Sequence, residues 1–469
     1  MTPMSDLAER RLFAPATVSA PFALVLLLTP GMTWASTAPD LTASGFGYLS
    51  LAVFVLAYVL VVTEDITGLR KSKPLVLAAG LIWLLVSIAW QRSGIAGVAD
   101  TLRHNLLEYA ELLLFLLAAM TYVNTLEERR VFEALRARLI ARQVSFRAAF
   151  WLTGLMAFCL SPFIDNLTTA LVVGAIVVAM GRGKAAFIAP ACTNIVVAAN
   201  AGGAFSPFGD ITTLMVWQKG LLGFFEFFRL FAPCLINWLV PAVCMSIAVP
   251  KGSPTQESGT VEIKRGGFVV MLLFALTILL TVCAQQFAGL PPFLGMMSGL
   301  GLLQLAGYFI RRREVRELRE GERPFDVFMS IRGIEWDTLL FFYGVILCVG
   351  GLAALGYLNA FSSVSYQALG PSAANVLLGL LSAVIDNIPI MFAVLTLQPE
   401  MSHGHWLLVT LTAGVGGSLL SIGSAAGVAL MGQAHGSYTF LSHLKWTWAV
   451  ALGYAASIAV HFAINAVYF

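Results

Sequence analysis

Ser161-Pro162-Phe163-Ile164-Asp165-Asn166-Leu167-Thr168-Thr169 is a polar interruption within the otherwise apolar stretch 148–180. A second Asp-Asn pair occurs in Val384-Ile385-Asp386-Asn387-Ile388-Pro389, inside the apolar stretch 371–398. A charged side chain in a membrane-spanning segment costs at least about 2.5 kcal/mol on insertion scales, so its presence indicates a function. Prolines beside both pairs indicate interrupted helices, which leave backbone groups available to a ligand. Two such interruptions in corresponding halves of a chain are typical of a transporter binding site.

The composition is that of a membrane protein. The 469 residues are 58% hydrophobic and only 11% charged, whereas soluble domains carry roughly 25% charged residues. The formal net charge of +3 predicts no nucleic-acid partner, because basic residues in a membrane protein mainly set its orientation. The six cysteines form no CxxC motif, which favours small apolar side chains over metal or disulfide chemistry.

Apolar stretches of 18 or more residues can cross about 30 Å of hydrocarbon. Stretches of this kind occur at 45–63, 74–91, 106–124, 222–249, 267–286, 291–310, 337–358 and 446–467. The segments 185–219 and 405–440 are too long for one straight span and contain glycine-rich breaks, so each is predicted to be a broken helix. The two Asp-Asn stretches are too short to cross twice, and we expect re-entrant hairpins with the Asp-Asn pair at each tip.

Lysine and arginine in short loops predict the cytoplasmic side of the membrane. The loops 359–370 and 398–404 contain neither residue. Basic residues gather instead in loops that one topology places together, namely Arg70, Lys71, Lys73, Arg129, Arg130, Arg136, Arg138, Arg142, Arg147, Arg182, Lys184, Lys251, Lys264, Arg265, Arg311 to Arg323, and Lys445. This topology predicts a C-terminus on the non-cytoplasmic side.

The same topology reveals an internal repeat. The order helix, helix, helix, hairpin, broken helix, helix occurs in residues 45–249 and again in 267–469, with opposite predicted orientations and a cytoplasmic loop at 250–266. The sequence therefore predicts an all-α polytopic membrane protein. Its architecture would be an inverted repeat of five spans plus one re-entrant hairpin each, as in many secondary transporters.

Two further segments carry predictions. Residues 1–44 contain Arg10-Arg11, an apolar core at 21–28 and Ser36-Thr37-Ala38, which fits either a cleaved signal peptide or a first transmembrane helix. Residues 125–147 place Leu126, Phe132, Leu135, Leu139 and Ile140 at helical spacing, with arginines on the other face. This pattern predicts a helix in the cytoplasmic interface, and the alternative is a solvated linker helix.

The first broken helix contains Ala199-Asn200-Ala201-Gly202-Gly203-Ala204-Phe205-Ser206-Pro207-Phe208-Gly209-Asp210-Ile211-Thr212-Thr213. Its counterpart is Gly414-Val415-Gly416-Gly417-Ser418-Leu419-Leu420-Ser421-Ile422-Gly423-Ser424. Alignment of Gly203 with Gly417 also matches Gly209 with Gly423 and places Asp210 opposite Ser424. We expect the two breaks to be formed by Gly202, Gly203, Gly209, Gly416, Gly417 and Gly423.

These segments predict a pair of pockets, each made from a hairpin tip and a broken helix. Carbonyl, amide and carboxylate oxygens are hard ligands that suit an alkali cation, and half-helix N-termini help to keep carboxylates ionised. The candidate cation and proton ligands are Asp165, Asn166, Thr168, Thr169, Ser206, Asp210, Thr212, Asp386, Asn387, Ser421 and Ser424, with Asp165, Asp210 and Asp386 as the alkali-metal ligands. The alternative is structural, since the aspartates can cap helices and the hydroxyls can bond backbone carbonyls.

The charge of the side chains in the predicted site distinguishes a cation substrate from an anion substrate. The predicted site contains three acids and no lysine or arginine, which favours a cation over an anion. Burial raises the pKa of carboxylic acids in general, and an acid that binds either a proton or a metal ion couples the two by competition. An anion or metalloid transporter of the same architecture remains an alternative, because half-helix termini and bound sodium can replace basic residues. A membrane-embedded aspartyl protease is a more distant one. No enzymatic activity and no cofactor beyond the transported ions are expected.

SPFIDNLTTALV at 161–172 and ANAGGAFSPFGDITT at 199–213, followed by VIDNIP at 384–389 and GGSLLSIGSAAG at 416–427, resemble the NhaD-type sodium/proton antiporters. These belong to the broad ion-transporter superfamily, which also holds arsenite permeases and divalent-anion/sodium symporters. The resemblance covers nearly the whole chain beyond about residue 45. It implies exchange of internal Na+ or Li+ for external H+ in the bacterial inner membrane, in salt and alkaline-pH tolerance, by a homodimer. The anion symporters typically carry Ser-Asn-Thr at the hairpin tips, whereas this chain carries Ile-Asp-Asn at both.

Overall fold

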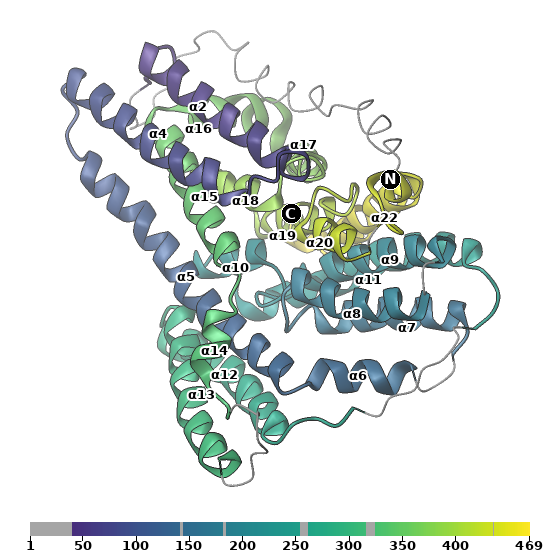
Figure 1. Ribbon diagram of the computed structural model, residues 1–469. Helices are drawn as coiled ribbons and strands as arrows, with labels where there is room; N and C mark the ends of the chain where they lie inside the picture. The colour runs from purple at the N-terminus through teal and green to yellow at the C-terminus, as the bar shows by residue number, and fades with distance from the viewer. Residues whose placement is uncertain (1–39, 141–143, 182–183, 254–260, 316–323, 435) are drawn as a thin grey trace, which may run out of the picture. The chain divides into compact units, whose positions relative to one another are not determined.

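The computed structural model describes residues 40–140, 144–181, 184–253, 261–315, 324–434 and 436–469. Nearly all of the predicted segment 1–44 and the centre of the loop 250–266 lie outside the described residues. In the described part, nine helices are long and apolar enough to cross a membrane and no strand occurs (Figure 1). The prediction of an all-α polytopic membrane protein is confirmed.

The long apolar helices are α2 (Gly45–Val62), α4 (Ser72–Arg92), α5 (Val98–Glu128), α9 (Ala185–Gly203), α11 (Phe231–Ala248, continuing the 3-10 helix η3 at Phe224–Leu230), α12 (Gly267–Ala288), α13 (Pro292–Glu314), α15 (Trp336–Ala354) and α22 (Thr447–Ile464). The hairpin and half-helix elements are α7 (Phe146–Leu160), α8 (Asn166–Gly181), α10 (Ile211–Gln218), α17 (Ala368–Leu381), α18 (Asn387–Leu397), α19 (His403–Gly416) and α20 (Ala425–Gln433). Short connections are α3 (Glu64–Thr67), α6 (Val131–Ile140), α14 (Val327–Arg332), α16 (Tyr357–Ser362), η4 (Ser363–Gln367), α21 (Phe440–Leu444) and η5 (Ala466–Tyr468).

The predicted helix at 125–147 is in fact divided. α5 continues to Glu128, and Arg130 adopts a left-handed backbone conformation with φ of 59° before α6 begins at Val131. A non-glycine residue rarely takes this conformation, and it ends a helix when it does. Leu126 therefore belongs to a different helix from Phe132 and Leu135, although all three line one groove.

The described chain forms two compact units. The first contains residues 40–107 and 336–369. In it α4 packs against α15, with the indole of Trp83 donating to the Leu347 carbonyl at 2.9 Å and that of Trp90 to the Ala354 carbonyl at 3.1 Å. Gly344 of α15 admits the backbone of Leu75, as small residues do where membrane helices approach closely.

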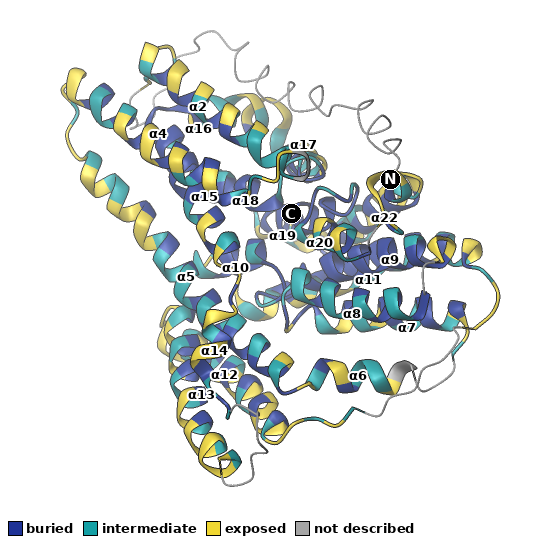
Figure 2. Ribbon diagram, in the orientation of Figure 1, coloured by how far each residue is buried: buried dark blue, intermediate teal, exposed yellow. Residues whose placement is uncertain are grey.

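The second unit contains residues 108–335 and 370–469, including both hairpins and both broken helices. α9 and α19 form its centre and are almost fully buried (Figure 2). The second arm of each hairpin packs on the second half of the other copy's broken helix, α8 on α20 and α18 on α10. This reciprocal exchange is what duplicated elements related by a two-fold axis produce. The opposite orientation of the repeats in a membrane stays a prediction.

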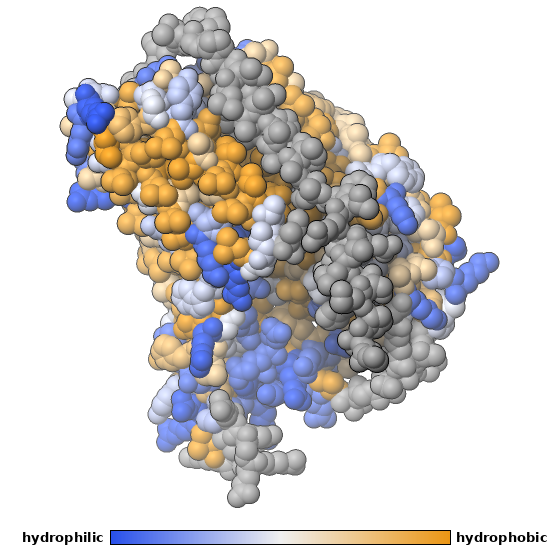
Figure 3. Space-filling model, turned by 45° about the horizontal axis from the view of Figure 1, so that its top comes forward, coloured by the Kyte–Doolittle hydropathy of each residue, from blue (hydrophilic) through white to orange (hydrophobic). Residues whose placement is uncertain are grey.

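Exposed apolar side chains are abundant on both units. Leu56 and Leu77 in the first unit, and Leu272 and Leu279 in the second, each keep more than half of their surface exposed. Figure 3 shows apolar residues over much of one face. Such continuous apolar surface belongs against lipid rather than water.

Candidate cation site

The carboxylate of Asp210 joins the two hairpin tips. Its Oδ2 accepts hydrogen bonds from the side-chain amides of Asn166 and Asn387, each at 3.1 Å. Its Oδ1 accepts from the backbone N–H of Thr212 at 3.1 Å. Only 5% of Asp210 and 5% of Asn387 is exposed. The sequence predicts two separate pockets, and the structure instead connects both tips to one buried carboxylate.

Asp210 is held in place as the N-cap of α10. The chain leaves α9 at Gly203, turns through 204–209 and re-enters a helix at Ile211, with Asp210 in an extended conformation. The turn is tight, because a methyl group on Gly203 would lie 2.6 Å from the Gly209 carbonyl oxygen. Only glycine allows this approach, which explains the predicted break.

The first hairpin tip is fixed to this break through backbone atoms. The N–H of Asn166 donates to the Gly209 carbonyl at 3.1 Å, and the Ser161 hydroxyl donates to the Ala199 carbonyl at 2.6 Å. The Ser206 hydroxyl donates to the Pro162 carbonyl at 2.7 Å. The predicted pairing of a hairpin tip with the broken helix of its own copy is therefore present.

The second copy repeats this geometry. A methyl group on Gly417 would lie 2.6 Å from the Gly423 carbonyl oxygen, as for Gly203 and Gly209. Ser424 caps α20 with φ and ψ of −142° and 149°, against −143° and 147° for Asp210. The equivalence of Asp210 and Ser424 predicted from the glycine spacing is thus a structural one.

The prolines beside the two hairpin tips occupy different positions relative to the helices. Pro162 lies in the turn between α7 and α8, as predicted. Pro389 is the third residue of α18 and does not interrupt a helix. A proline in a first helical turn loses no hydrogen bond, because the N–H groups there have no intrahelical partner. The second interruption lies before it, at 382–386.

The other two aspartates precede helices as well. Asp165 is directly before α8, where its carboxylate accepts from the Thr168 N–H at 2.9 Å and the Thr168 hydroxyl at 2.8 Å. Asp386 is directly before α18, and its charge repels that of Asp210. Helix N-termini stabilise anions. No described lysine or arginine forms an ion pair with Asp165 or Asp210.

The predicted hydroxyl ligands divide by their partners. Thr169 and Ser206 donate to backbone carbonyls, Ser421 contacts the Met431 sulfur at 3.3 Å, and Ser424 accepts from the Gly427 N–H. The Thr212 hydroxyl differs, because it is fully buried and faces the Asp210 carboxylate, but forms no hydrogen bond of normal geometry with any described residue. A buried hydroxyl without a partner costs about 1–3 kcal/mol, and this one is two residues from Asp210.

Asn200 completes the cluster and is absent from the predicted ligands. Its side-chain oxygen accepts from Asn166 at 3.0 Å, and its side-chain N–H donates to the Ser418 hydroxyl at 2.8 Å. It thereby links the two broken helices. The available signal in the sequence was an amide side chain two residues before the paired glycines of the predicted break.

His403 and His405, in the first turn of α19, have separate partners. His405 contacts the hydroxyls of Ser402 and Ser372, and His403 lies 3.4 Å from Glu226. In the described part of the chain no three His, Cys, Asp or Glu side chains form a metal cluster. All six cysteines are free; three are buried, two are half-buried and Cys159 is exposed.

An all-α membrane protein with paired helix hairpins around a buried carboxylate defines an ion-coupled membrane transporter. The sequence profile of the citrate-transporter family matches residues 15–414. The chain is 55% identical to the Na+/H+ antiporter NhaD of Alkalimonas amylolytica, over 94% of this chain and 96% of the relative. It is 55% identical to NhaD of Vibrio cholerae, over 94% and 98%, and 31% identical to sodium/proton antiporter 1 of Arabidopsis thaliana, over 89% and 72%.

The chain therefore belongs to the citrate-transporter family and, within it, to the NhaD-type Na+/H+ antiporters. It is a multi-pass membrane protein.

Proposed function

We propose that this protein exchanges Na+ for H+ at Asp210. The observation that carries the proposal is the buried Asp210 carboxylate, which amides from both hairpins hold and with which no lysine or arginine of the described residues forms an ion pair. One carboxylate binds either a proton or a cation. The proton and Na+ compete for the same oxygens. A proton that binds from one side of the membrane therefore displaces Na+, and Na+ that binds from the other side displaces the proton.

The ligands follow from the hydrogen bonds around Asp210. Sodium takes oxygen donors, and the nearest are the carboxylate of Asp210 and the hydroxyl of Thr212. The amides of Asn166 and Asn387 now donate N–H to Asp210, so each would bring its oxygen to the cation by turning over when Na+ replaces the hydrogen bond. Asp386 adds negative charge that attracts a second cation or proton. Asp165, Thr168, Ser421 and Ser424 hold the helix ends that surround the site.

Several finer features belong to the same proposal. The exchanger accepts Li+ as well as Na+, extrudes sodium under salt or alkaline stress, works as a homodimer and lies in a bacterial inner membrane with its C-terminus on the non-cytoplasmic side. The positive-inside pattern of the loops and the names of the relatives support this setting. Anion transport is less favoured, since Asp210 and Asp386 would repel a carboxylate substrate.

The experiment is exchange by purified protein in liposomes that contain a pH-sensitive dye. Addition of NaCl or LiCl should move protons, and addition of choline citrate should not. Single variants Asp165→Asn, Asp210→Asn and Asp386→Asn locate the essential carboxylate. Proton movement with citrate but not with sodium would refute the proposal, and so would normal sodium exchange by all three variants.

A further inference from the structure

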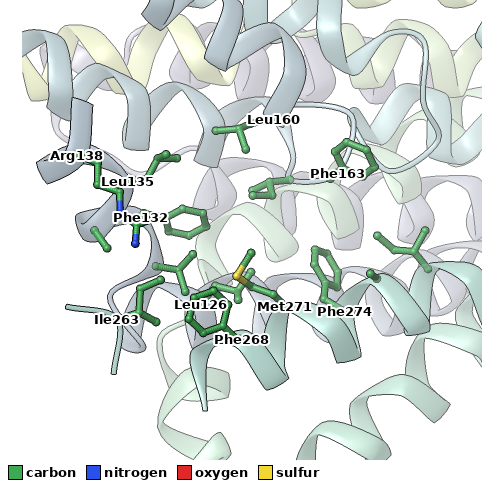
Figure 4. Close-up of a pocket in the computed structure, with 15 residues that line it drawn as sticks. Leu126, Phe132, Leu135, Arg138, Leu160, Phe163, Ile263, Phe268, Met271 and Phe274 are labelled. Atoms are coloured by element: carbon green, nitrogen blue, oxygen red, sulfur yellow. The ribbon is translucent and has the colours of Figure 1, made fainter. Parts of the chain in front are cut away.

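A groove of about 370 Å³ lies beside the first hairpin, within the second unit. The end of α5, residues 131–138 of α6, the hairpin tip and the first half of α12 form its walls (Figure 4). Its volume is in the range of small-molecule sites. Apart from Arg138, every residue that lines it is apolar.

The shape of the groove is that of a channel along α12. Lining residues on this helix run from Phe268 to Ile278, a rise of about 15 Å at 1.5 Å per residue. That length equals about half of the 30 Å hydrocarbon core, which is one leaflet. Figure 4 places Arg138 and Ile263 at one end, and Phe163 and Phe274 at the other.

The groove opens onto membrane-facing surface. On α12, Phe268 is 67% exposed and Leu272 is 71% exposed, while Phe163 at the hairpin tip is 57% exposed. Apolar side chains this exposed lie against acyl chains when the protein is in a bilayer. The groove is therefore open to the lipid phase of the membrane.

The end marked by Arg138 carries positive charge. Arg138 is exposed and forms no ion pair within the described part of the chain. Ile263 lines the same end and lies between Glu262 and the pair Lys264-Arg265, so basic residues outnumber acids there. The loop charges predict that this end faces the cytoplasm, where anionic lipid headgroups attract basic residues.

We propose that this groove binds one acyl chain of an anionic phospholipid of the cytoplasmic leaflet, with the lipid phosphate paired to Arg138. The apolar walls take the chain and the basic end takes the headgroup, so both parts of the lipid have a partner. The bound chain contacts Leu160, Phe163 and Ile164, the last of which directly precedes Asp165. The lipid thereby touches the hairpin that carries Asn166. This site is additional to ion exchange.

The test is photolabelling of the intact protein in phosphatidylcholine liposomes, with a phosphatidylglycerol that bears a diazirine near the end of one acyl chain as the probe. Peptides from α6 and α12 should carry the label. Ala275→Trp fills the groove and should lower labelling there about fivefold or more. Leu272→Trp is the matched control, since it adds the same ring on the exposed face of α12 and should leave labelling unchanged.

The headgroup is tested separately. Arg138→Gln should reduce the preference for the phosphatidylglycerol probe over a phosphatidylcholine probe about fivefold, and Arg138→Lys should keep it. If Ala275→Trp does not fold, as judged by gel filtration, Leu135→Trp fills the groove from α6 instead. Undiminished labelling of the filled variant would overturn the proposal, as would an Arg138→Gln protein with unchanged preference. Cross-links between two chains at these positions would assign the groove to a second copy and also overturn it. The labelling does not depend on transport, so it is independent of the exchange assay.

Discussion

Replacement of Asp210 by asparagine is the most informative single change. It keeps the size of the side chain and removes its charge. Asp210 accepts three hydrogen bonds, two at Oδ2 and one at Oδ1. An asparagine has an oxygen at only one of these positions, so its NH2 group must face the N–H of Thr212 or the amides of Asn166 and Asn387. Both the charge and part of the hydrogen bonding are lost.

The expected magnitude follows from the lost attraction to the cation. Two unit charges 4 Å apart interact by about 4 kcal/mol at an effective dielectric constant of 20. Each 1.4 kcal/mol corresponds to about a factor of ten in affinity. Asp210→Asn should therefore weaken sodium binding by about three powers of ten, which abolishes exchange at sodium concentrations that saturate the wild-type protein.

The assay is sodium-driven proton movement in dye-loaded liposomes, titrated with NaCl. Asp326→Asn is the matched control, because Asp326 caps α14 by accepting from the Phe328 N–H at 3.1 Å, as Asp210 caps α10, and belongs to no part of the proposed site. This change should cost at most about 0.5–2 kcal/mol of stability and should leave the sodium dependence nearly unchanged. Gel filtration and thermal unfolding of both variants separate a lost ligand from a lost fold.

A charge swap sharpens the test. The double variant Asp210→Asn with Asn387→Asp keeps one carboxylate and one amide in the same pair, 3.1 Å apart in the wild type. If the role of Asp210 is to supply negative charge at this point, the swap should recover exchange that the single variant lacks. Exchange by Asp210→Asn at wild-type sodium concentrations would refute the reasoning, and a swap no better than the single variant would refute the shared site.

Three further predictions concern stability, each measured by thermal unfolding in detergent. Gly203→Ala should cost about 1–3 kcal/mol of folding stability, because the new methyl group would lie 2.6 Å from the Gly209 carbonyl oxygen. The control Gly80→Ala on α4 places its methyl group in open space and should leave stability unchanged or raise it. Equal effects of the two changes would exclude a steric cause. Arg129 is 2% exposed, pairs with two glutamates and stacks on a phenylalanine, so Arg129→Met should cost about 3–5 kcal/mol of folding stability. The control Arg103→Gln removes an exposed ion pair and should cost at most about 1 kcal/mol. A similarly small loss of stability for Arg129→Met would contradict this prediction. Burial lowers the pKa of His443, in α21, from 6.5 to about 4, so the unfolded state takes up a proton first and stability should fall as the pH drops from 6.5 to 4. His443→Gln should flatten this dependence, and an unchanged profile would assign it to other groups.

The sequence by itself determined the membrane class, the order of the elements and the location of the breaks. Apolar stretches fix helices because a helix satisfies all of its backbone hydrogen bonds internally in lipid. The glycine spacing 203/209 and 417/423 identified equivalent turns, because such close backbone approaches exclude larger residues. These signals are local, so each can be recognised from a short stretch of chain.

Tertiary structure decided how those pieces meet. Asn387 and Asp210 are 177 positions apart in the chain, and no periodicity states that both hairpin tips converge on one carboxylate. Packing also separated the Thr212 hydroxyl, which forms no hydrogen bond of normal geometry with the described residues, from Thr169 and Ser206, which donate to carbonyls. Arg130, in a left-handed conformation, separates α6 from α5, and α6 then packs against α8, so that residues of α5, α6, the first hairpin tip and α12 line one groove. Such long-range contacts depend on the combined packing of many side chains, and a linear pattern of residue types does not encode them individually.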